Sequence, residues 1–516
     1  MSSQTQPQPY ARRWQALAVL ALSLLVVSLD NTILNVALPT IREDLDASSS
    51  DLQWIVDSYL LVFAGLLLAA GTIGDRFGRR RALFTGLAIF GLGSLLAAIS
   101  SSSTELIAAR ALMGVGAAAI MPTTLSILTN IFPAHERPKA IALWAATAGM
   151  GIAIGPISGG LLIEHFAWGS VFLVNLPIVV VGLIAGAMLI PESRDPESPK
   201  LDIPGIGLSI AGLTAIVWGL IEAPERGWTS PAILTAFAGG AAILAAFIAW
   251  ERRTPQPMLD VSVFRNLRFS AASISITFVF FALMGVMYFM TTYLQSVMGL
   301  SALEAGVRMI PIALGLILAS RLSVALTERL GTKLVVGGGL LLVAGALGAF
   351  TTIGVETEYL WKVAGALTTM GFGMGLAMAP ATEAIMGALP QAKAGIGSAM
   401  NDVVREVGGT LGVAVLGSLV STSYASGMDG ATAALPPEAA EAASDSVGAA
   451  HGVAAEIGGA GAQLIAAADQ SFVDAMSTAS TLAAGVALIG ALLALAFLPS
   501  RARRETAPAR LEPVPA

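Results

Sequence analysis

The feature that most constrains this chain is an apolar stretch of about 20 residues that recurs fourteen times along its 516 residues. Folded as an α-helix, each stretch can cross the roughly 30 Å hydrocarbon core of a bilayer. The sequence therefore predicts an all-α integral membrane protein with fourteen transmembrane helices. We expect them at 15–38, 52–73, 82–100, 106–129, 139–163, 169–190, 203–222, 231–250, 269–295, 304–326, 334–353, 360–385, 395–423 and 479–498.

Basic residues are distributed unevenly between the segments that join these spans. With the N-terminus inside the cell, 21 of the 28 Lys and Arg residues fall on the cytoplasmic side, three fall outside and four lie within spans. Such a bias is typical of cytoplasmic loops, and omitting one span would scatter the charges over both sides. Arg outnumbers Lys by 23 to 5, which suggests a GC-rich bacterial genome. We expect a multi-pass protein of the bacterial inner membrane with both termini cytoplasmic.

The composition excludes several kinds of chemistry. The chain has no cysteine, so it forms no disulfide and no thiolate metal site. Its three histidines lie far apart, which argues against a metal site, and it lacks a phosphate-binding loop of the Walker type. The net charge of −6 offers no footprint for nucleic acid. We expect no enzymatic activity, no cofactor and no metal, and any energy coupling must come from a source other than ATP hydrolysis by that loop.

The chain also repeats itself at a spacing near 255 residues. Residues 74–80 after the second span are similar to 327–333 after the tenth, and 113–116 are similar to 370–373. Two parallel copies of a six-helix unit explain this common offset. The sequence predicts an N-terminal six-helix bundle at 1–190, a linker with two extra transmembrane helices at 191–268, a C-terminal six-helix bundle at 269–500 and a cytoplasmic tail at 501–516.

Residues 424–478 form the one long outer loop that this scheme predicts. The loop contains seven acidic residues and no Lys or Arg. Pro436 and Pro437 would start one helix, and the Gly-rich run at 458–461 would separate it from a second. Two alternatives fit the composition: a two-helix hairpin beside the outer vestibule that influences cation release, or a solvated Ala-rich linker.

Acidic residues inside the spans point to transport chemistry. Asp30 lies about 13 Å from the outer end of the first span, at 1.5 Å per residue. An ionised carboxylate at that depth is costly, so we expect it to bind a proton or to face Arg110 of the fourth span. A permanent structural pair with Arg110 is the alternative, and we favour proton coupling because intramembrane acids usually line pathways.

The thirteenth span carries a second charged group. Asp402 and Glu406 are four residues apart on one helix face, with Arg405 beside both. We expect one acid to pair with Arg405 and the other to titrate, and the sequence does not choose between them. Glu222, Glu304 and Glu383 fall near span ends, where we expect solvation.

Aromatic and Met side chains predict a wall for a lipophilic cation, because ring faces attract cations and Met adapts to varied shapes. Asp57 in the second span would supply the charge, unless it is an interfacial acid that reaches solvent. For any single aromatic or Met residue, contact with lipid is the alternative. The residues expected at this site are Asp57, Trp54, Tyr59, Phe63, Tyr288, Tyr293 and Met374.

Four motifs resemble those of the major facilitator superfamily. Residues 71–80, GTIGDRFGRR, resemble its loop signature, and Arg110 with 114–116 resembles its fourth-span motif. Residues 151–160, GIAIGPISGG, resemble the fifth-span motif typical of its antiporters. Residues 29–39, LDNTILNVALP, resemble the first-span motif of the fourteen-helix drug/proton antiporters.

Residues 53–59 and 257–260 narrow the resemblance to the EmrB/QacA subfamily, and within it to quaternary-ammonium efflux pumps of the QacA and SmvA type. The resemblance covers residues 14–500 and implies a major facilitator fold with two six-helix bundles and two inserted helices. It implies proton-coupled efflux of lipophilic cationic drugs by alternating access. A proton-coupled importer or uniporter of a polar nutrient is the alternative on the same fold. We expect a monomer surrounded by membrane lipids.

The resemblance also assigns roles to residues of this chain. The implied gating motif, which breaks and remakes charge contacts, is Gly71, Asp75, Arg76, Gly78 and Arg79. The implied antiporter motif is Gly151, Gly155, Pro156 and Gly159, where Gly-Pro admits helix bending. Proton coupling falls to Asp30, Arg110, Asp402 and Glu406, and the resemblance favours Asp402 over Glu406 as the transport residue. Leu316 lies where some such pumps have an acid, which argues against doubly charged cations.

Overall fold

The computed structural model describes residues 10–195, 201–255, 257–457 and 461–500, and these residues form helices and their connections, without a strand. The N-terminal half contains α1 (Arg13–Asp44), α2 (Ser49–Phe77), α3 (Arg79–Ala98), α4 (Ser103–Ile131), α5 (Arg137–His165), α6 (Ser170–Leu173) and α7 (Asn175–Leu189). The middle of the chain contains α8 (Ile203–Arg226), α9 (Pro231–Glu251) and the short η1 (Val261–Arg265).

The C-terminal half continues the same pattern. Its helices are α10 (Leu267–Thr292), η2 (Tyr293–Val297), α11 (Ala302–Arg308), α12 (Ile310–Leu330), α13 (Thr332–Phe350), η3 (Tyr359–Val363), α14 (Ala364–Met386), η4 (Gln391–Lys393), α15 (Ala394–Thr432), α16 (Pro437–Asp445), α17 (Val447–Ile457) and α18 (Gly461–Phe497). Within the described residues, thirteen helices are long and apolar enough to cross a bilayer. The 29-residue α5 takes the fifth of the fourteen predicted places. The predicted all-α membrane fold is confirmed.

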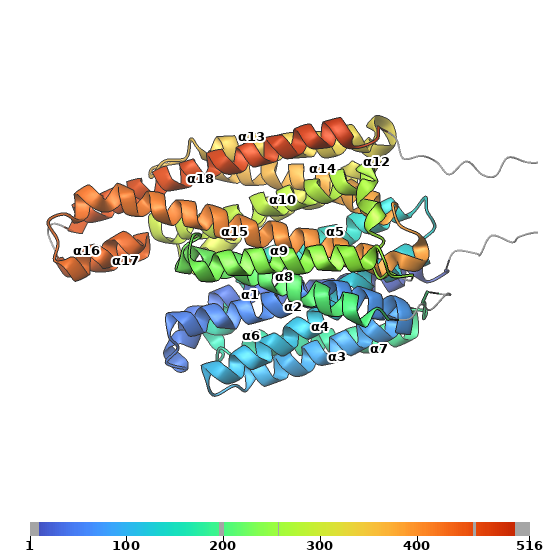
Figure 1. Ribbon diagram of the computed structural model, residues 1–516. Coiled ribbons are helices and arrows are strands. Elements are labelled where there is room, and N and C mark those ends of the chain that lie inside the picture. The colour runs from blue at the N-terminus through green and yellow to red at the C-terminus, as the bar shows by residue number, and fades with distance from the viewer. Residues whose placement is uncertain (1–9, 196–200, 256, 458–460, 501–516) are drawn as a thin grey trace, which may run out of the picture.

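The two halves lie side by side as separate groups of helices (Figure 1). α1 to α4, α6 and α7 fill the lower part of the view, and α10 and α12 to α15 with α18 fill the upper part. α5 lies between these two groups, where it packs against α1 of its own half and against α12 and α14 of the other, while α2 and α4 pack against α15. We call the end of the bundle where α1 and α3 begin the arginine-rich end, because Arg13, Arg79 and Arg80 lie there.

The two inserted helices differ in their contacts. α8 packs against α2 of one half and α15 of the other, and α9 packs on α8. Just beyond α8, the indole N–H of Trp228 donates to Ser418 Oγ of α15 at 3.1 Å. The insert therefore lies along the line where the two halves meet.

α15 and α18 extend well beyond their predicted spans. α15 has 39 residues and α18 has 37, so each is over 50 Å long at about 1.5 Å per residue. Their projecting ends carry the short α16 and α17 at the end of the molecule opposite the arginine-rich end (Figure 1). Hydropathy ends a predicted span where polar residues appear, whereas Ala-rich sequence continues a helix regardless. The predicted tail at 501–516 lies outside the described residues.

Glycines let the two halves touch at the arginine-rich end. A Cβ on Gly71 of α2 would lie 2.6 Å from the carbonyl oxygen of Gly395 in α15 and 2.8 Å from Ala399 Cβ. Those distances are far inside van der Waals contact, so the backbones of α2 and α15 approach only because Gly71 has no side chain.

Gly71→Ala should therefore destabilise the folded protein by about 1–3 kcal/mol, since overpacking forces the helices apart. Gly348→Ala in α13 is a matched control, because nothing lies within 4 Å of a Cβ at that helical position. Alanine favours a helix over glycine, so the control should be neutral or slightly more stable. Thermal unfolding of the purified proteins in detergent measures both, and equal midpoints would contradict a backbone contact at Gly71.

Candidate functional site

The first charged centre is a buried ion pair inside the N-terminal half. Asp30 of α1 and Arg110 of α4 are both fully buried, and Arg110 Nη1 lies 2.5 Å from Asp30 Oδ2. Asn175 Nδ2 of α7 donates to Asp30 Oδ1 at 3.1 Å. A carboxylate held by a guanidinium and an amide can remain ionised without water.

Neighbouring groups hold Arg110 in place. Its Nε donates to the carbonyl of Ile55 at 3.1 Å, and its guanidinium carbon lies 4.4 Å from the centroid of the Tyr59 ring. The structure thus confirms that Asp30 faces Arg110. Proton coupling through this pair stays a prediction, because the same contacts suit a permanent structural pair.

The second charged centre lies on α15, where it faces the N-terminal half. Asp402 is 2% exposed and Arg405 is 5% exposed, while Glu406 is half-buried. Among the described residues no salt bridge joins Arg405 to either acid, and Asp402 Oδ2 has no hydrogen-bond donor. The expected pairing of one acid with Arg405 is wrong for this conformation, because the guanidinium lies between aromatic rings instead.

Tyr59 of α2 lies near both centres. Its ring packs on Arg110, and its side chain lies within electrostatic range of Asp30 and Glu406. Phe63, one turn later, stacks on Tyr59 with ring centroids 5.9 Å apart. These two predicted wall residues therefore lie together beside the first charged centre.

The other predicted wall residues do not join them. Asp57, half-buried, faces α8, where the charges of Glu222 and Glu225 act on it, and Trp54 on the same helix is also half-buried. The remaining three are dispersed: Tyr288 is 46% exposed, Tyr293 donates from its hydroxyl to the carbonyl of Gly354 at 3.0 Å, and Met374 is buried inside α14. The sequence cannot show this, because residues at different heights on different helices have no fixed relative position.

The three acids near span ends differ in their solvent exposure. Glu304 is exposed and caps the start of α11 as expected, and Glu383 is half-buried. Glu222 is 5% exposed and forms an ion pair with Arg226 one turn later, so its expected solvation is wrong. The insertion of α8 between the two halves buries it.

Asp75 near the end of α2 and Arg79 at the start of α3 bind the start of α15 at the arginine-rich end. Asp75 accepts hydrogen bonds from the backbone N–H groups of Gly395 at 2.9 Å and Ile396 at 3.2 Å, at the start of α15. Arg79 Nε donates to Asp75 Oδ1 at 2.8 Å, and its Nη2 donates to the carbonyl of Ala392 at 2.8 Å. A helix N-terminus attracts a carboxylate, so this ion pair joins the N-terminal half to α15.

The segment after α7 lies against the same residues. Arg79 N donates to the carbonyl of Ser193 at 2.9 Å, and Asp195 N donates to the carbonyl of Asp75 at 2.7 Å. Gly78 has φ +116°, and a Cβ there would lie 2.8 Å from Glu192 Oε1. Gly78 is therefore needed both for its backbone angle and for the approach of the segment that leads to α8.

Two predicted motif positions remain. Arg76 places its guanidinium carbon 5.4 Å from the centroid of the Phe77 ring. In the antiporter motif, Cβ atoms on Gly151, Gly155 and Gly159 of α5 would collide with Ser28, Thr32 and Ile33 of α1, the first at 2.5 Å. Pro156 lies within a continuous α5, and its side chain is outside the described part of the structure. The motif thus acts here as a close contact between α1 and α5.

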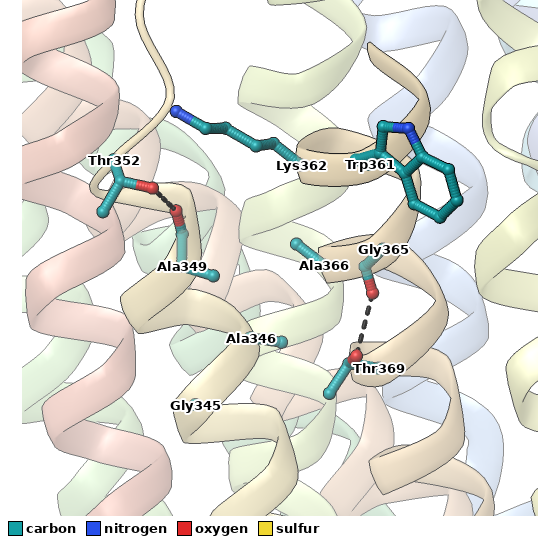
Figure 2. A pocket seen from close by; sticks show the side chains of 9 residues that line it. All are labelled: Gly345, Ala346, Ala349, Thr352, Trp361, Lys362, Gly365, Ala366 and Thr369. Carbon is teal, nitrogen blue, oxygen red and sulfur yellow. Dashed lines mark hydrogen bonds between the residues drawn. The ribbon is translucent and has the colours of Figure 1, made fainter. Parts of the chain in front are cut away.

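A cavity of about 430 Å³ lies away from both charged centres, between α13 and the start of α14 (Figure 2). Trp361 and Lys362 stand at its edge, and Gly345, Ala346 and Gly365 line it. It contains none of the predicted site residues. The buried centres are therefore the candidate site.

Sequence reasoning missed two residues of these centres. Asn175 is a lone amide in the apolar α7, and Trp144 is a large aromatic residue in α5 beside the Gly-rich run. A lone polar side chain in a spanning helix is a usable signal, because lipid cannot satisfy it. The role of Trp144 gives no such signal, since its partner Arg405 is distant in sequence.

Asp75→Asn should loosen the arginine-rich end, because the amide keeps the shape but loses the charge that binds Arg79 and the start of α15. The chain has no cysteine, so Ser398→Cys places a single buried thiol on α15. We expect maleimide to label this thiol several-fold faster in the Asp75→Asn background. Asp260→Asn, an exposed cap of η1, is the control and should not change the labelling rate. Equal labelling rates in Ser398→Cys alone, with Asp75→Asn and with Asp260→Asn would mean that Asp75 does not hold this end closed.

Comparison with known proteins places these features in context. Residues 20–413 match the family described as the Major Facilitator Superfamily. The multidrug efflux pump LfrA of Mycolicibacterium smegmatis is 39% identical over 93% of this chain and 95% of its own. The methyl viologen resistance protein SmvA of Salmonella typhimurium is 35% identical over 80% of this chain and 83% of its own. The crystal structure of the human organic anion transporter MFSD10 shares the fold, with a TM-score of 0.61 at 15% identity over 95% of this chain and all of that one.

Proposed function

Because the chain belongs to the Major Facilitator Superfamily and is a transporter, we propose that it exports lipophilic cations, including quaternary ammonium compounds and dyes, in exchange for protons. The protein would lie in the bacterial inner membrane as a monomer, with the arginine-rich end in the cytoplasm. The bias of basic residues supports this orientation.

The observation that carries the proposal is the pair of buried acidic centres on opposite sides of the contact between the halves. Asp30 is fully buried with Arg110, and Asp402 is almost fully buried with one oxygen unpartnered. Buried carboxylates in membrane proteins are costly and mark ion or proton pathways. An enclosed anion without a partner has two stable states, one with a proton and one with a cation.

A lipophilic cation and a proton would compete for the Asp402 carboxylate, and this competition would couple drug export to proton entry. A lipophilic cation is attracted to Asp402 only while the carboxylate is ionised, and a bound proton removes that attraction. Protons that enter from outside would then displace the drug.

Alternating access requires the two ends to open in turn. The bond of Asp75 and Arg79 to the start of α15 holds one end closed. Breaking these few charge-assisted bonds would open the arginine-rich end to the cytoplasm, where drugs are collected. The relatives support export, since LfrA is a multidrug efflux pump and SmvA confers methyl viologen resistance.

Everted membrane vesicles, whose interior respiration loads with protons, test the proposal. Addition of tetraphenylphosphonium should release protons, and Asp30→Asn should reduce this release to background with the protein still inserted. Asp402→Asn should reduce it more than Glu406→Gln, because Asp402 is the more deeply buried acid. Glu304→Gln, an exposed helix cap, should behave as wild type.

Export that persists in the presence of a protonophore would contradict proton coupling through Asp30. Full proton release by the Asp30→Asn variant would contradict it as well. An importer or uniporter of a polar nutrient would give no proton release with any lipophilic cation. Each signal should be divided by the amount of inserted protein, since removing one member of a buried pair costs about 3–5 kcal/mol.

A further inference from the structure

Arg405 occupies an unusual place for a buried arginine. Its guanidinium carbon lies 4.9 Å from the centroid of the Trp144 ring and 5.4 Å from that of the Phe280 ring. Trp144 belongs to α5, Phe280 to α10 and Arg405 to α15. The arginine therefore joins aromatic rings from both halves of the protein.

The two rings are held in position by the fold. Trp144 is fully buried, and its indole N–H donates to Thr124 Oγ1 of α4 at 3.1 Å. α10 lies against α15 because Gly408 and Gly412 have no side chains, where a Cβ would collide with the carbonyls of Thr277 and Phe281. Contacts other than those with Arg405 therefore position Trp144 and the helix that carries Phe280.

The polar contacts of Arg405 are few. Its Nη2 donates to Thr382 Oγ1 at 3.3 Å, and its Nε is buried without an acceptor. Asp402, one turn earlier on the same helix, keeps a buried oxygen without a donor, although the two charges act on each other. A guanidinium with only a structural role would be expected to bind a carboxylate through two N–H groups. Here the guanidinium forms no salt bridge with a described carboxylate and lies against two ring faces.

Ring faces are the feature that binds a cation lacking N–H groups. Quaternary ammonium and phosphonium ions cannot donate hydrogen bonds, so aromatic faces and a nearby anion are what recognise them. Trp144, Phe280 and the free oxygen of Asp402 supply both. The guanidinium of Arg405 lies where such a cation would bind.

We propose that Trp144 and Phe280 form the cation-binding pair for the exported substrate, and that Arg405 is a tethered cation that occupies the pair when no substrate is bound. This rests on the proposed export of lipophilic cations. An arriving cation displaces the guanidinium from the ring faces and takes its place beside the carboxylate of Asp402. Competition with a tethered group lowers affinity for every cation by the same factor, and so favours release.

Equilibrium binding of tetraphenylphosphonium to the purified protein tests the proposal. Arg405→Gln should bind about tenfold more tightly, if the guanidinium occupies the rings about nine-tenths of the time. Arg405→Lys keeps a tethered cation and should remain near wild type. Adding Trp144→Leu or Phe280→Leu to Arg405→Gln should remove the gain. Arg308→Gln is the matched control, because Arg308 lies 4.9 Å from the Tyr359 ring at another site, and its loss should change nothing.

Thr382→Val provides a second test if Arg405→Gln does not fold. It removes the one hydrogen bond that the structure gives Arg405 and should tighten binding in the same direction, by a smaller factor. Folded variants that bind as weakly as wild type, or more weakly, would overturn the tethered cation while leaving export intact. Wild-type protein that neither binds nor exports any lipophilic cation would instead contradict the proposed function, and this inference with it.

Discussion

The free-energy cost of burying a charge away from water is the main constraint on this structure. Different sites offset that cost in different ways. Asp30 is enclosed by a guanidinium and an amide, so its charge is fully compensated. Asp75 is held by Arg79 and by the first N–H groups of α15. At Asp402 and Arg405 the compensation is incomplete, since among the described residues no salt bridge joins them and each keeps a buried atom without a partner. Compensated charges stabilise one arrangement, whereas uncompensated charges can exchange partners at low cost.

Close backbone contact is the second organising feature. Gly71 brings α2 onto α15, Gly151 brings α5 onto α1, and Gly408 brings α10 onto α15. Lipid provides no hydrophobic force between helices, so association depends on such van der Waals contact. These contacts place the Trp144 ring of one half beside the Arg405 guanidinium of the other. The charge-based chemistry therefore depends on positions that carry no side chain at all.

The parts beyond the two six-helix bundles attach at the same functional regions. α8 lies against α2 and α15, the helices that meet at the arginine-rich end. The segment that leads to it hydrogen-bonds the loop of Asp75 and Arg79. At the opposite end, His451 of α17 lies 2.8 Å from Asp469 of α18, which fastens the projecting helices together. Each addition thus contacts a helix of the two six-helix bundles.

The sequence by itself determined the number and order of the spans, the repeat, the family and the acids worth testing, because apolar length, charge bias and short motifs are local properties. It also predicted that Asp30 faces Arg110, since few partners exist for a charge at that depth. Only the tertiary structure decided which charges are paired. Arg405 lies one turn from Asp402 in sequence, yet it faces Trp144, more than 250 residues away. Helix rotation and tilt, which set such contacts, follow from side-chain packing throughout the bundle and leave no periodic signal in the chain.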